Sequence, residues 1–308
     1  MNIIFICQAV DQNDTLLAST IGWIREFAQR PEIGKVTALA LRVGEFDLPE
    51  NVEVVKIKGA NRLATTFNFY KEVLRRIKNT DWFFIYQGGH YPLLLLPFKL
   101  LGKKIYQWKA HPRVSLMMRF YAYVCDTKIF TSTPSAFPMK LKKVKVVGQG
   151  VDTEKFNIQN IPKTGDWVTV GRIAPVKRLE KAIELLAHYN KRYDVDYRLD
   201  IYGPVFLEKD RKYKRELDQL ILRLGLEKLV EFKGAVNRDK LPEILNRYKL
   251  FISFNDGAVD RSVLEAAACG LPVFTPNKCV AEMDISSRGV IVKNYSLKVV
   301  IKRIFKEI

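Results

Sequence analysis

The alternation of apolar strand-like runs with amphipathic segments constrains the fold of this chain more than any other feature. Segments with helical periodicity lie between several of these strand-like runs, at residues 20–29, 67–78, 92–101 and 114–124. In the first half, the strand-like runs lie at residues 3–7, 36–41, 52–57, 82–86, 104–108, 128–131 and 144–147. Continuous apolar strands separated by helices are typical of a parallel sheet covered on both faces. The first half is therefore predicted to be an α/β domain.

The same alternation restarts after a polar segment at 152–166, which is broken by Pro162 and Gly165. Helices are predicted at 179–189, 213–224 and 241–248. Strands are predicted at 167–170, 198–202, 230–233, 250–254, 273–275 and 290–292. The pattern predicts two Rossmann-like domains with parallel sheets, residues 1–157 and 158–308, that face each other across a cleft.

Bulk properties exclude several classes of protein. A hydrophobic content of 48% in 308 residues fits a globular chain with two cores. The longest apolar run, 93–101, is too short for a membrane span, and the N-terminus has the pattern of a first strand rather than a signal peptide. Four cysteines without paired spacing and three histidines argue against a zinc site or a disulfide framework. We expect a cytoplasmic protein.

The net charge of +18 favours anionic partners, which include nucleotide diphosphates, acidic membrane surfaces and nucleic acid. The basic run 140–145 suggests peripheral contact with an anionic membrane, which would place the protein at the inner membrane face. A non-catalytic α/β protein that binds nucleic acid is an alternative that also explains the charge. It does not explain the polar and charged residues at predicted strand ends. A dehydrogenase is disfavoured, because no Gly-x-Gly-x-x-Gly motif follows the first strand.

Residues 253–274 predict a strand, a polar loop with Gly257, a helix from Ser262, and a second strand after Pro272. A loop that opens into a helix N-terminus can bind an anion, because the N–H groups of the first turn lack partners within the helix. Glu265 lies one turn into this helix, within reach of ligand hydroxyls. Ser262 and Glu265 also have the spacing of a capping box, in which Glu265 would only accept a backbone N–H.

Two cations follow the first strand of the second half. Arg172 lies just past the strand end and Lys177 at the start of the next helix, where a phosphate is expected in an α/β fold. Arginine can hold a phosphate with two hydrogen bonds, and lysine supplies a mobile charge. Arg178 is a weaker candidate. The alternative is that these are solvated surface cations.

The run Leu-Glu-Ala-Ala-Ala-Cys-Gly-Leu-Pro-Val at 264–273 resembles the donor-site signature of glycosyltransferase family 4, retaining enzymes with the two-domain GT-B fold. Gly-Arg-Ile at 171–173, with a lysine five residues after the arginine, resembles the segment that holds the donor diphosphate in that family. The resemblance implies that Glu265 binds the ribose and that segment 231–236 contacts the base through its backbone. It also implies that the last helix, 296–308, returns to the first domain. The donor-binding residues implied are Gly171, Arg172, Lys177, Gly203, Val236, Gly257, Arg261, Ser262, Val263 and Glu265.

The resemblance also suggests catalytic residues. His111, which follows a strand in the first half, resembles the family's histidine near the donor sugar, and His90 would line the acceptor side. Many members carry a second glutamate where this chain has Gly257, so Asp256 or Asp260 would take over its contacts with the sugar. The catalytic set implied is His111, Arg172, Lys177, Asp256 and Asp260. No metal site is expected, because the Asp-x-Asp at 194–196 fits a solvated turn.

We therefore predict a glycosyltransferase that moves a hexose from a nucleotide-diphosphate sugar, UDP- or GDP-linked, to a hydroxyl acceptor. The reaction would proceed with retention and without metal, and no cofactor would be permanently bound. The acceptor could be a glycan, a lipid-linked molecule or a small molecule. A nucleotide-sugar epimerase on the same fold is a further alternative. The sequence specifies neither the sugar, the acceptor nor the oligomeric state.

Overall fold

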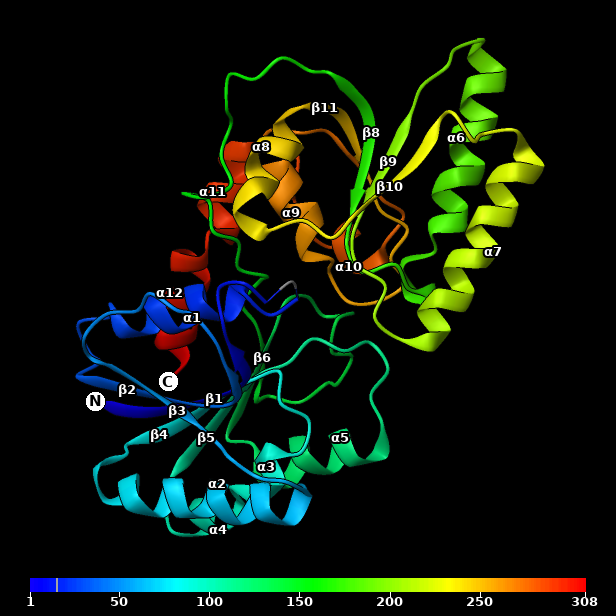
Figure 1. Ribbon diagram of the computed structural model, residues 1–308. Coiled ribbons are helices and arrows are strands. Elements are labelled where there is room, and N and C mark those ends of the chain that lie inside the picture. Colours follow the sequence, from blue (N-terminus) through cyan, green and yellow to red (C-terminus); the bar gives the residue numbers. More distant parts are fainter. Residues whose placement is uncertain (15) are drawn as a thin grey trace. The chain divides into compact units, whose positions relative to one another are not determined.

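The computed structural model describes residues 1–14 and 16–308. Its contacts divide the chain into two units (Figure 1). Unit 1 comprises Met1–Gly148 and Leu297–Ile308, and unit 2 comprises Gln149–Ser296. The division lies at Gly148/Gln149 rather than at 157/158, because the segment after Gly148 joins unit 2. Within that segment Val151 forms a β-bridge with Ser296, and Phe156 is fully buried.

Unit 1 is built on a seven-stranded sheet in the order β3-β2-β1-β4-β5-β6-β7, in which every pairing is parallel. Its strands are β1 (Asn2–Val10), β2 (Lys35–Val43), β3 (Val52–Lys56), β4 (Trp82–Tyr86), β5 (Lys104–Trp108), β6 (Lys128–Thr131) and β7 (Val144–Val146). The strand order changes direction between β1 and β4. Ligands of open α/β sheets bind outside the carboxyl ends of the strands at such a switch point.

The two faces of this sheet are covered by different helices (Figure 1). Ile3, Phe5 and Cys7 of β1 pack with α1 (Ser19–Ala28) and α12 (Leu297–Glu307). Ile4 and Ile6, which point to the opposite face, pack with α2 (Arg62–Arg76), α3 (Tyr91–Leu94) and α4 (Leu96–Leu100). This alternation explains why β1 is apolar throughout.

The remaining helices of unit 1 lie on the same side as α2. A short helix, α5 (Leu116–Phe120), continues into a π-helical turn at Tyr121–Cys125. The side chain of Ser115 caps α5 by accepting from the Met118 N–H, and Asn61 caps α2 by accepting from the Ala64 N–H at 2.9 Å. The segment predicted as one helix at 92–101 divides into α3 and α4 near Leu95, where Pro97 cannot donate a backbone hydrogen bond.

Helix α12 belongs to unit 1 although the preceding residues belong to unit 2. Its side chains Val300, Ile301 and Ile304 are fully buried in the core that covers β1. Phe305 packs against Phe27 of α1, with ring centroids 5.4 Å apart. The apolar stripe of this helix is therefore buried against α1 and the sheet.

Unit 2 is built on a five-stranded sheet in the order β10-β9-β8-β11-β12, again with every pairing parallel. Its strands are β8 (Gly165–Val170), β9 (Leu199–Tyr202), β10 (Val230–Gly234), β11 (Tyr248–Ile252) and β12 (Val273–Phe274). The switch point lies between β8 and β11. The carboxyl ends of these two strands therefore define where unit 2 should bind a ligand.

The helices of unit 2 are α6 (Leu179–Tyr193), α7 (Glu208–Leu224), α8 (Leu241–Asn246), α9 (Arg261–Ala268), α10 (Lys278–Ala281) and α11 (Arg288–Tyr295). The apolar faces of α6 and α7 meet in a core that includes Ile183, Leu186 and Leu217. One prediction is wrong: 290–292 forms part of α11 rather than a strand. The Ser287 side chain caps this helix by accepting from the Val290 N–H at 3.4 Å, so the helical start signal outweighs the β-branched run.

All four cysteines are free and buried. Among the described residues, no helix combines the length and the apolar composition that crossing a membrane requires.

Candidate functional site

The candidate site of unit 2 lies where the chain leaves β8 and β11 at the switch point. β8 is followed by Gly171, Arg172 and the 3₁₀ turn Pro175–Lys177, which precedes α6. β11 is followed by the loop 253–260, which leads into α9. The predicted cations and the predicted acidic residues therefore come from two adjacent strands, as expected of a binding site in this fold.

Two glycine turns shape the floor of this site. Gly171 and Gly203, which follow β8 and β9, have φ angles of +149° and +155°. A Cβ at Gly203 would lie 1.8 Å from the carbonyl oxygen of Gly171, so a side chain cannot fit there. A Cβ at Gly171 would lie 2.9 Å from Nζ of Lys177. The two glycines thus let neighbouring backbones approach and let the Lys177 side chain cross the turn.

Lys177 and Asp260 form an ion pair across the switch point. Nζ of Lys177 donates to Oδ2 of Asp260 at 2.5 Å, and both side chains are largely buried, at 18% and 11% exposure. Burial favours the neutral form of Asp260, but the Lys177 ammonium and hydrogen bonding with Ser262 outweigh it and hold the pKa of Asp260 below its usual value. The carboxylate is therefore ionised at neutral pH and partly neutralises Lys177.

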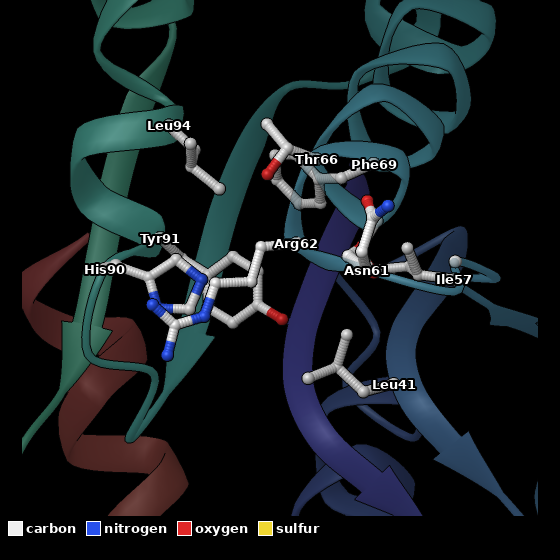
Figure 2. A pocket seen from close by; sticks show the side chains of 11 residues that line it. Leu41, Ile57, Asn61, Arg62, Thr66, Phe69, His90, Tyr91 and Leu94 are labelled. Carbon is white, nitrogen blue, oxygen red and sulfur yellow. Dashed lines mark hydrogen bonds between the residues drawn. The ribbon is translucent and has the colours of Figure 1, made fainter.

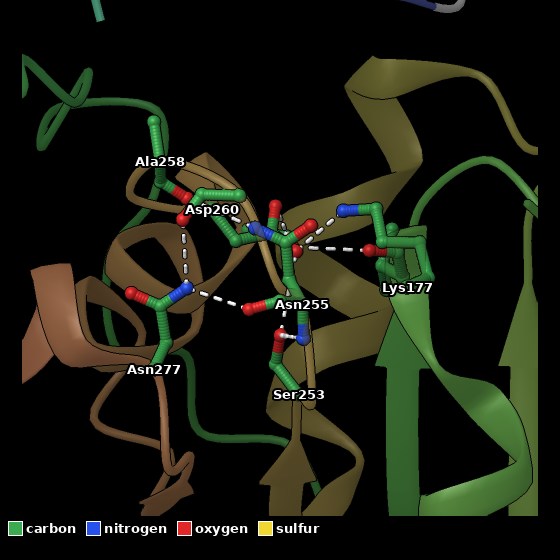
Figure 3. A network of polar contacts seen from close by, with 9 residues as sticks. Lys177, Ser253, Asn255, Ala258, Asp260 and Asn277 are labelled. Carbon is green, nitrogen blue, oxygen red and sulfur yellow. Dashed lines mark hydrogen bonds and ion pairs between the residues drawn. The ribbon is translucent and has the colours of Figure 1, made fainter. Parts of the chain in front are cut away.

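Hydrogen bonds from two side-chain amides to backbone carbonyls hold the loop 253–260 in place, and we call it the fastened loop (Figure 3). Nδ2 of Asn277 donates to the carbonyls of Asn255 at 2.6 Å and Gly257 at 3.1 Å. Nδ2 of Asn255 donates to the carbonyl of Ala258 at 2.9 Å. Because Asn277 and Asn255 are both buried, these bonds fix the peptide planes of the loop before any ligand binds.

Three arginines lie in the segments that follow β8 and β11. Arg172 keeps a side-chain exposure of 31%, and its Nε lies 3.9 Å from Oδ2 of Asp210, a fully buried residue in the first turn of α7. Arg178 is the left-handed residue before α6, and its Nε lies 3.6 Å from Oε1 of Glu180. Within residues 1–14 and 16–308, Nη1 of Arg261 is buried without a hydrogen-bond partner. The site therefore holds arginine donors that an anion can use.

Glu265 is almost fully buried, at 2% exposure, and its carboxylate is paired with Arg238. Arg238 lies in the 3₁₀ turn Arg238–Lys240, and its guanidinium stands over the ring of Phe156 at 5.2 Å from the centroid. The capping-box alternative is not what the structure shows. The N-cap of α9 is Asp260, and Ser262 instead approaches the Val170 carbonyl at 3.0 Å and Oδ1 of Asp260 at 2.9 Å.

Other predicted donor-binding residues are placed as follows. Gly257 lies in the fastened loop, and the N–H of Asp256 donates to the Val176 carbonyl at 2.9 Å. Val236 is half-buried in the loop after β10. The side chain of Val263 is fully buried, and its N–H donates to the Asp260 carbonyl at 3.1 Å.

The predicted residues of unit 1 lie at its own sheet edge. His111 is exposed after β5, and its Nδ1 lies 2.6 Å from the carbonyl oxygen of Arg113. His90, which precedes α3, stacks on Tyr91 with centroids 4.7 Å apart. His90 also lines a cavity of about 800 Å³.

This cavity lies at the carboxyl edge of the unit 1 sheet (Figure 2). Its lining is Leu41, Ile57, Gly59, Asn61, Arg62, Thr65, Thr66, Phe69, His90, Tyr91 and Leu94. The hydroxyl of Tyr91 is buried and, within the described part of the chain, has no hydrogen-bond partner. Burial raises the pKa of Tyr91 to about 12, so this hydroxyl keeps its proton and can donate it to a ligand.

Sequence reasoning missed three residues that organise the unit 2 site: Arg238, Asn255 and Asn277. Arg238 lies 27 positions before Glu265, so no local spacing links them. Asn277 follows β12 at the same carboxyl edge of the sheet, and that position was a usable signal. Over residues 1–14 and 16–308, no group of three His, Cys, Asp or Glu side chains is arranged to hold a metal ion.

Two parallel-sheet α/β units, with a site at the carboxyl edge of the second, define the GT-B class of fold. Solved structures support this. The chain matches HepE of Anabaena, solved with UDP and glucose, at 16% identity and a TM-score of 0.77, over 100% of this chain and 99% of that one. It matches the sucrose-phosphate synthase of Thermosynechococcus elongatus at 11% identity and a TM-score of 0.74, over 100% and 98%. A glycosyltransferase from Rickettsia africae matches at 12% identity and a TM-score of 0.68, over 99% and 97%.

The family follows from the sequence. Residues 151–306 match the model of the glycosyl transferases group 1, and the chain belongs to this family. The predictions of a GT-B fold and of a glycosyltransferase are thereby confirmed, and the alternative of a non-catalytic nucleic-acid-binding protein is set aside. No curated protein matches the chain in sequence.

Proposed function

We propose that the chain transfers a hexose from a nucleotide-diphosphate sugar to a hydroxyl acceptor. The observation that carries the proposal is the meeting of Lys177, Arg172 and the fastened loop 253–260 at the switch point of unit 2. UDP is the first nucleotide to test, since HepE was solved with UDP and with UDP-glucose, and GDP is the second.

Arg172, Lys177 and Arg261 would bind the diphosphate. Arg172 is accessible, and Nη1 of Arg261 is buried without a partner among the described residues, so both have donors for phosphate oxygens. Gly171 and Gly203 would let the phosphates approach the backbone. Glu265 would accept the ribose hydroxyls, and the backbone around Val236 would contact the base.

During transfer, the bond between the anomeric carbon and the diphosphate oxygen breaks and a bond to the acceptor oxygen forms. The negative charge that develops on the departing diphosphate would be stabilised by Arg172 and Lys177, which are positioned beforehand. We propose a family 4 enzyme that retains configuration, with the acceptor attacking on the face that the diphosphate leaves. The proton of the acceptor hydroxyl would pass to an oxygen of the departing diphosphate. Asp256 and Asp260 would contact the sugar, and no metal would be required because the cations neutralise the charge.

The acceptor would bind in the unit 1 cavity. Apolar side chains line much of it, while Arg62, His90 and the unpaired Tyr91 hydroxyl supply polar contacts. Such a mixture fits an acceptor that presents both an apolar group and hydroxyls. Tyr91→Phe removes only the hydroxyl, so transfer should fall while the affinity for UDP stays unchanged. An unaltered transfer rate in this variant contradicts the proposed role of Tyr91.

The donor proposal is tested by calorimetry and thermal shift with UDP, GDP, UMP, UDP-glucose and GDP-mannose. A ligand that binds the folded state raises its melting temperature. We expect a diphosphate to stabilise the protein more than UMP, because only the diphosphate has a second phosphate group to contact Arg172, Lys177 and Arg261. Equal affinities for UMP and UDP would show that the cations do not bind the diphosphate.

Product analysis with the nucleotide sugars of this panel separates two reactions. A transferase releases the free nucleoside diphosphate only as the sugar appears on an acceptor, whereas an epimerase converts the sugar without one. Transfer is measured with and without excess chelator. Loss of activity that magnesium or manganese restores would contradict metal independence.

A further inference from the structure

Unit 1 carries a concentration of exposed large apolar side chains on α2 to α5 and the turns beside them. Leu63 is 83% exposed, Leu100 80% and Leu116 84%. We call this set the α2–α5 surface, and it comprises Leu63, Phe67, Leu74, Leu93, Leu100, Leu101, Leu116, Met117, Phe120, Tyr123 and Val124. Large apolar patches on a protein surface mark sites of interaction with other molecules.

These helices form one layer on the face of the sheet opposite α1 and α12 (Figure 1). Tyr70 of α2 donates to the Leu94 carbonyl of α3 at 2.9 Å and lies against Phe98 of α4, with ring centroids 6.2 Å apart. Lys99 of α4 donates to the Val124 carbonyl, in the turn after α5, at 2.5 Å. The exposed side chains therefore belong to neighbouring helices: α2 contacts α3 and α4, and α4 contacts the turn after α5.

The charge of the same region is strongly one-sided. Between residues 82 and 151 the chain has eleven lysines and arginines and a single acidic residue, Asp126. Two of these cations, Lys128 and Lys145, pair with Glu307 of α12 and do not belong to the α2–α5 surface. Asp126 is buried, at 1% exposure, and so adds little to the surface. Arg119, Lys140 and Lys142 are exposed, and the neighbouring Lys143 donates to the Tyr123 carbonyl at 2.9 Å. Lys71 and Arg75 are exposed on α2, where Arg75 lies 3.5 Å from the carboxylate of Glu72.

We propose that the α2–α5 surface docks on an anionic lipid bilayer. Leucine, phenylalanine and tyrosine side chains would enter the boundary between head groups and acyl chains, and the lysines and arginines around them would contact anionic head groups. Nucleic acid fits the charge but offers no apolar phase for the exposed leucines. A second copy of the chain would present the same positive charge to this surface, and like charges oppose such a contact. The proposal does not depend on the donor site.

The test is co-sedimentation of the full chain, without nucleotide, with two kinds of vesicle. One is phosphatidylcholine alone and the other is an equal mixture of phosphatidylcholine and phosphatidylglycerol. Binding is measured at about 0.01 M and about 1 M salt, between which the Debye length falls from about 30 Å to about 3 Å. We expect binding to the anionic vesicles at low salt, at least tenfold stronger than to the neutral ones, and a clear weakening at high salt.

Three double variants separate the two contributions. L63S/F67S and L116S/M117S remove exposed apolar groups, and R119E/K140E reverses two charges. Each basic residue near an anionic surface contributes about fivefold in affinity, so R119E/K140E should weaken binding at least tenfold. A matched control, L222S/K212E, makes the same kinds of change on α7 of unit 2, where Leu222 is 63% exposed, and should bind vesicles normally.

All the altered side chains are exposed, so we expect each variant to fold. Circular dichroism checks this. No binding to anionic vesicles at low salt overturns the proposal, as does equal loss in the control. Formation of a dimer that only the apolar variants disrupt would assign the surface to a second copy instead. Binding of a DNA duplex that is stronger than vesicle binding and is lost in the same variants would assign it to nucleic acid.

Discussion

Nζ of Lys177 lies 2.5 Å from Oδ2 of Asp260, so the lysine expected to bind the donor diphosphate is paired with a carboxylate in the same site. The two residues are 83 positions apart and come from the ends of two adjacent strands, β8 and β11. A diphosphate that binds Lys177 must compete with this carboxylate or share the ammonium with it. Asp260 therefore sets the charge that the site offers to an anion.

Replacing Asp260 with asparagine should make UDP bind more tightly, by severalfold, because the positive charge of Lys177 is no longer neutralised. Lys177→Met should have the opposite effect and weaken UDP binding by about ten- to a hundredfold, since it removes a charge-assisted hydrogen bond. Isothermal calorimetry with UDP measures both. If Asp260→Asn weakens UDP as much as Lys177→Met does, the carboxylate positions the lysine rather than competing for it.

Gly203→Ala should damage both stability and donor binding. The added Cβ would lie 1.8 Å from the Gly171 carbonyl oxygen, and the φ of +155° is rarely adopted by other residues. Backbone strain alone costs about 1–3 kcal/mol, and the displaced Gly171 turn carries Arg172 and Lys177. The matched control is Gly225→Ala, with φ of +66° and no atom near its Cβ, which should cost about 1 kcal/mol without affecting UDP affinity.

Melting temperature and UDP affinity are measured on both glycine variants. If Gly203→Ala lowers the melting temperature but leaves the UDP affinity unchanged, the turn at Gly203 contributes to stability and not to donor binding.

The fold was predictable because its signals are local. The apolar runs around Phe5 and Phe84 are long enough to be recognised as buried strands, and the parallel sheet follows from the helices between them. The failure at 290–292 is local too: Val290, Ile291 and Val292 favour a strand by composition, but Ser287 supplies a helix cap just before them. The helix cap at Ser287 therefore outweighed the strand preference of the three β-branched residues.

The site was predictable only in part, because its organisation depends on contacts between distant segments. Arg172, Lys177 and Glu265 were identified from strand ends and from motif resemblance. The partners that fix them, Asp260 for Lys177 and Arg238 for Glu265, are set by the packing of separate loops. A single sequence carries no signal that pairs these positions.

The pairing of Glu265 with Arg238 allows the proposed ribose contact to be tested with matched variants. Glu265→Gln and Arg238→Gln each remove the ion pair, so both should lower the free energy of unfolding, by about 1–3 kcal/mol. Only Glu265→Gln removes the carboxylate, which accepts hydroxyl hydrogen bonds more strongly than an amide does. We therefore expect UDP affinity to fall about tenfold or more in Glu265→Gln and little in Arg238→Gln.

Chemical denaturation gives the stabilities and calorimetry gives the affinities. Equal affinities for UDP in the two variants would mean that Glu265 serves the ion pair alone and does not bind the ribose.

Asp126 should make the stability of the protein fall as pH rises. Its carboxylate is buried in unit 1, and within the described residues neither oxygen has a hydrogen-bond partner. Lys143, the cation beside it, donates to the backbone carbonyls of Tyr123 and Asp126 at 2.9 and 3.0 Å instead. Burial raises the pKa of Asp126 to about 8, although Lys143, Lys99 and Lys109 oppose the shift.

The sign follows from proton linkage. Between about pH 4 and about pH 8, the unfolded chain releases the Asp126 proton while the folded protein retains it, so the free energy of unfolding falls by up to about 1.4 kcal/mol per pH unit. Asp126→Asn keeps the shape of the protonated side chain but cannot ionise. The variant should match the parent near pH 4 and exceed it increasingly toward pH 8. Urea denaturation across this range measures the difference, with Glu227→Gln, an exposed site in unit 2, as the control. A constant difference between parent and Asp126→Asn at every pH would show that Asp126 does not titrate in this window.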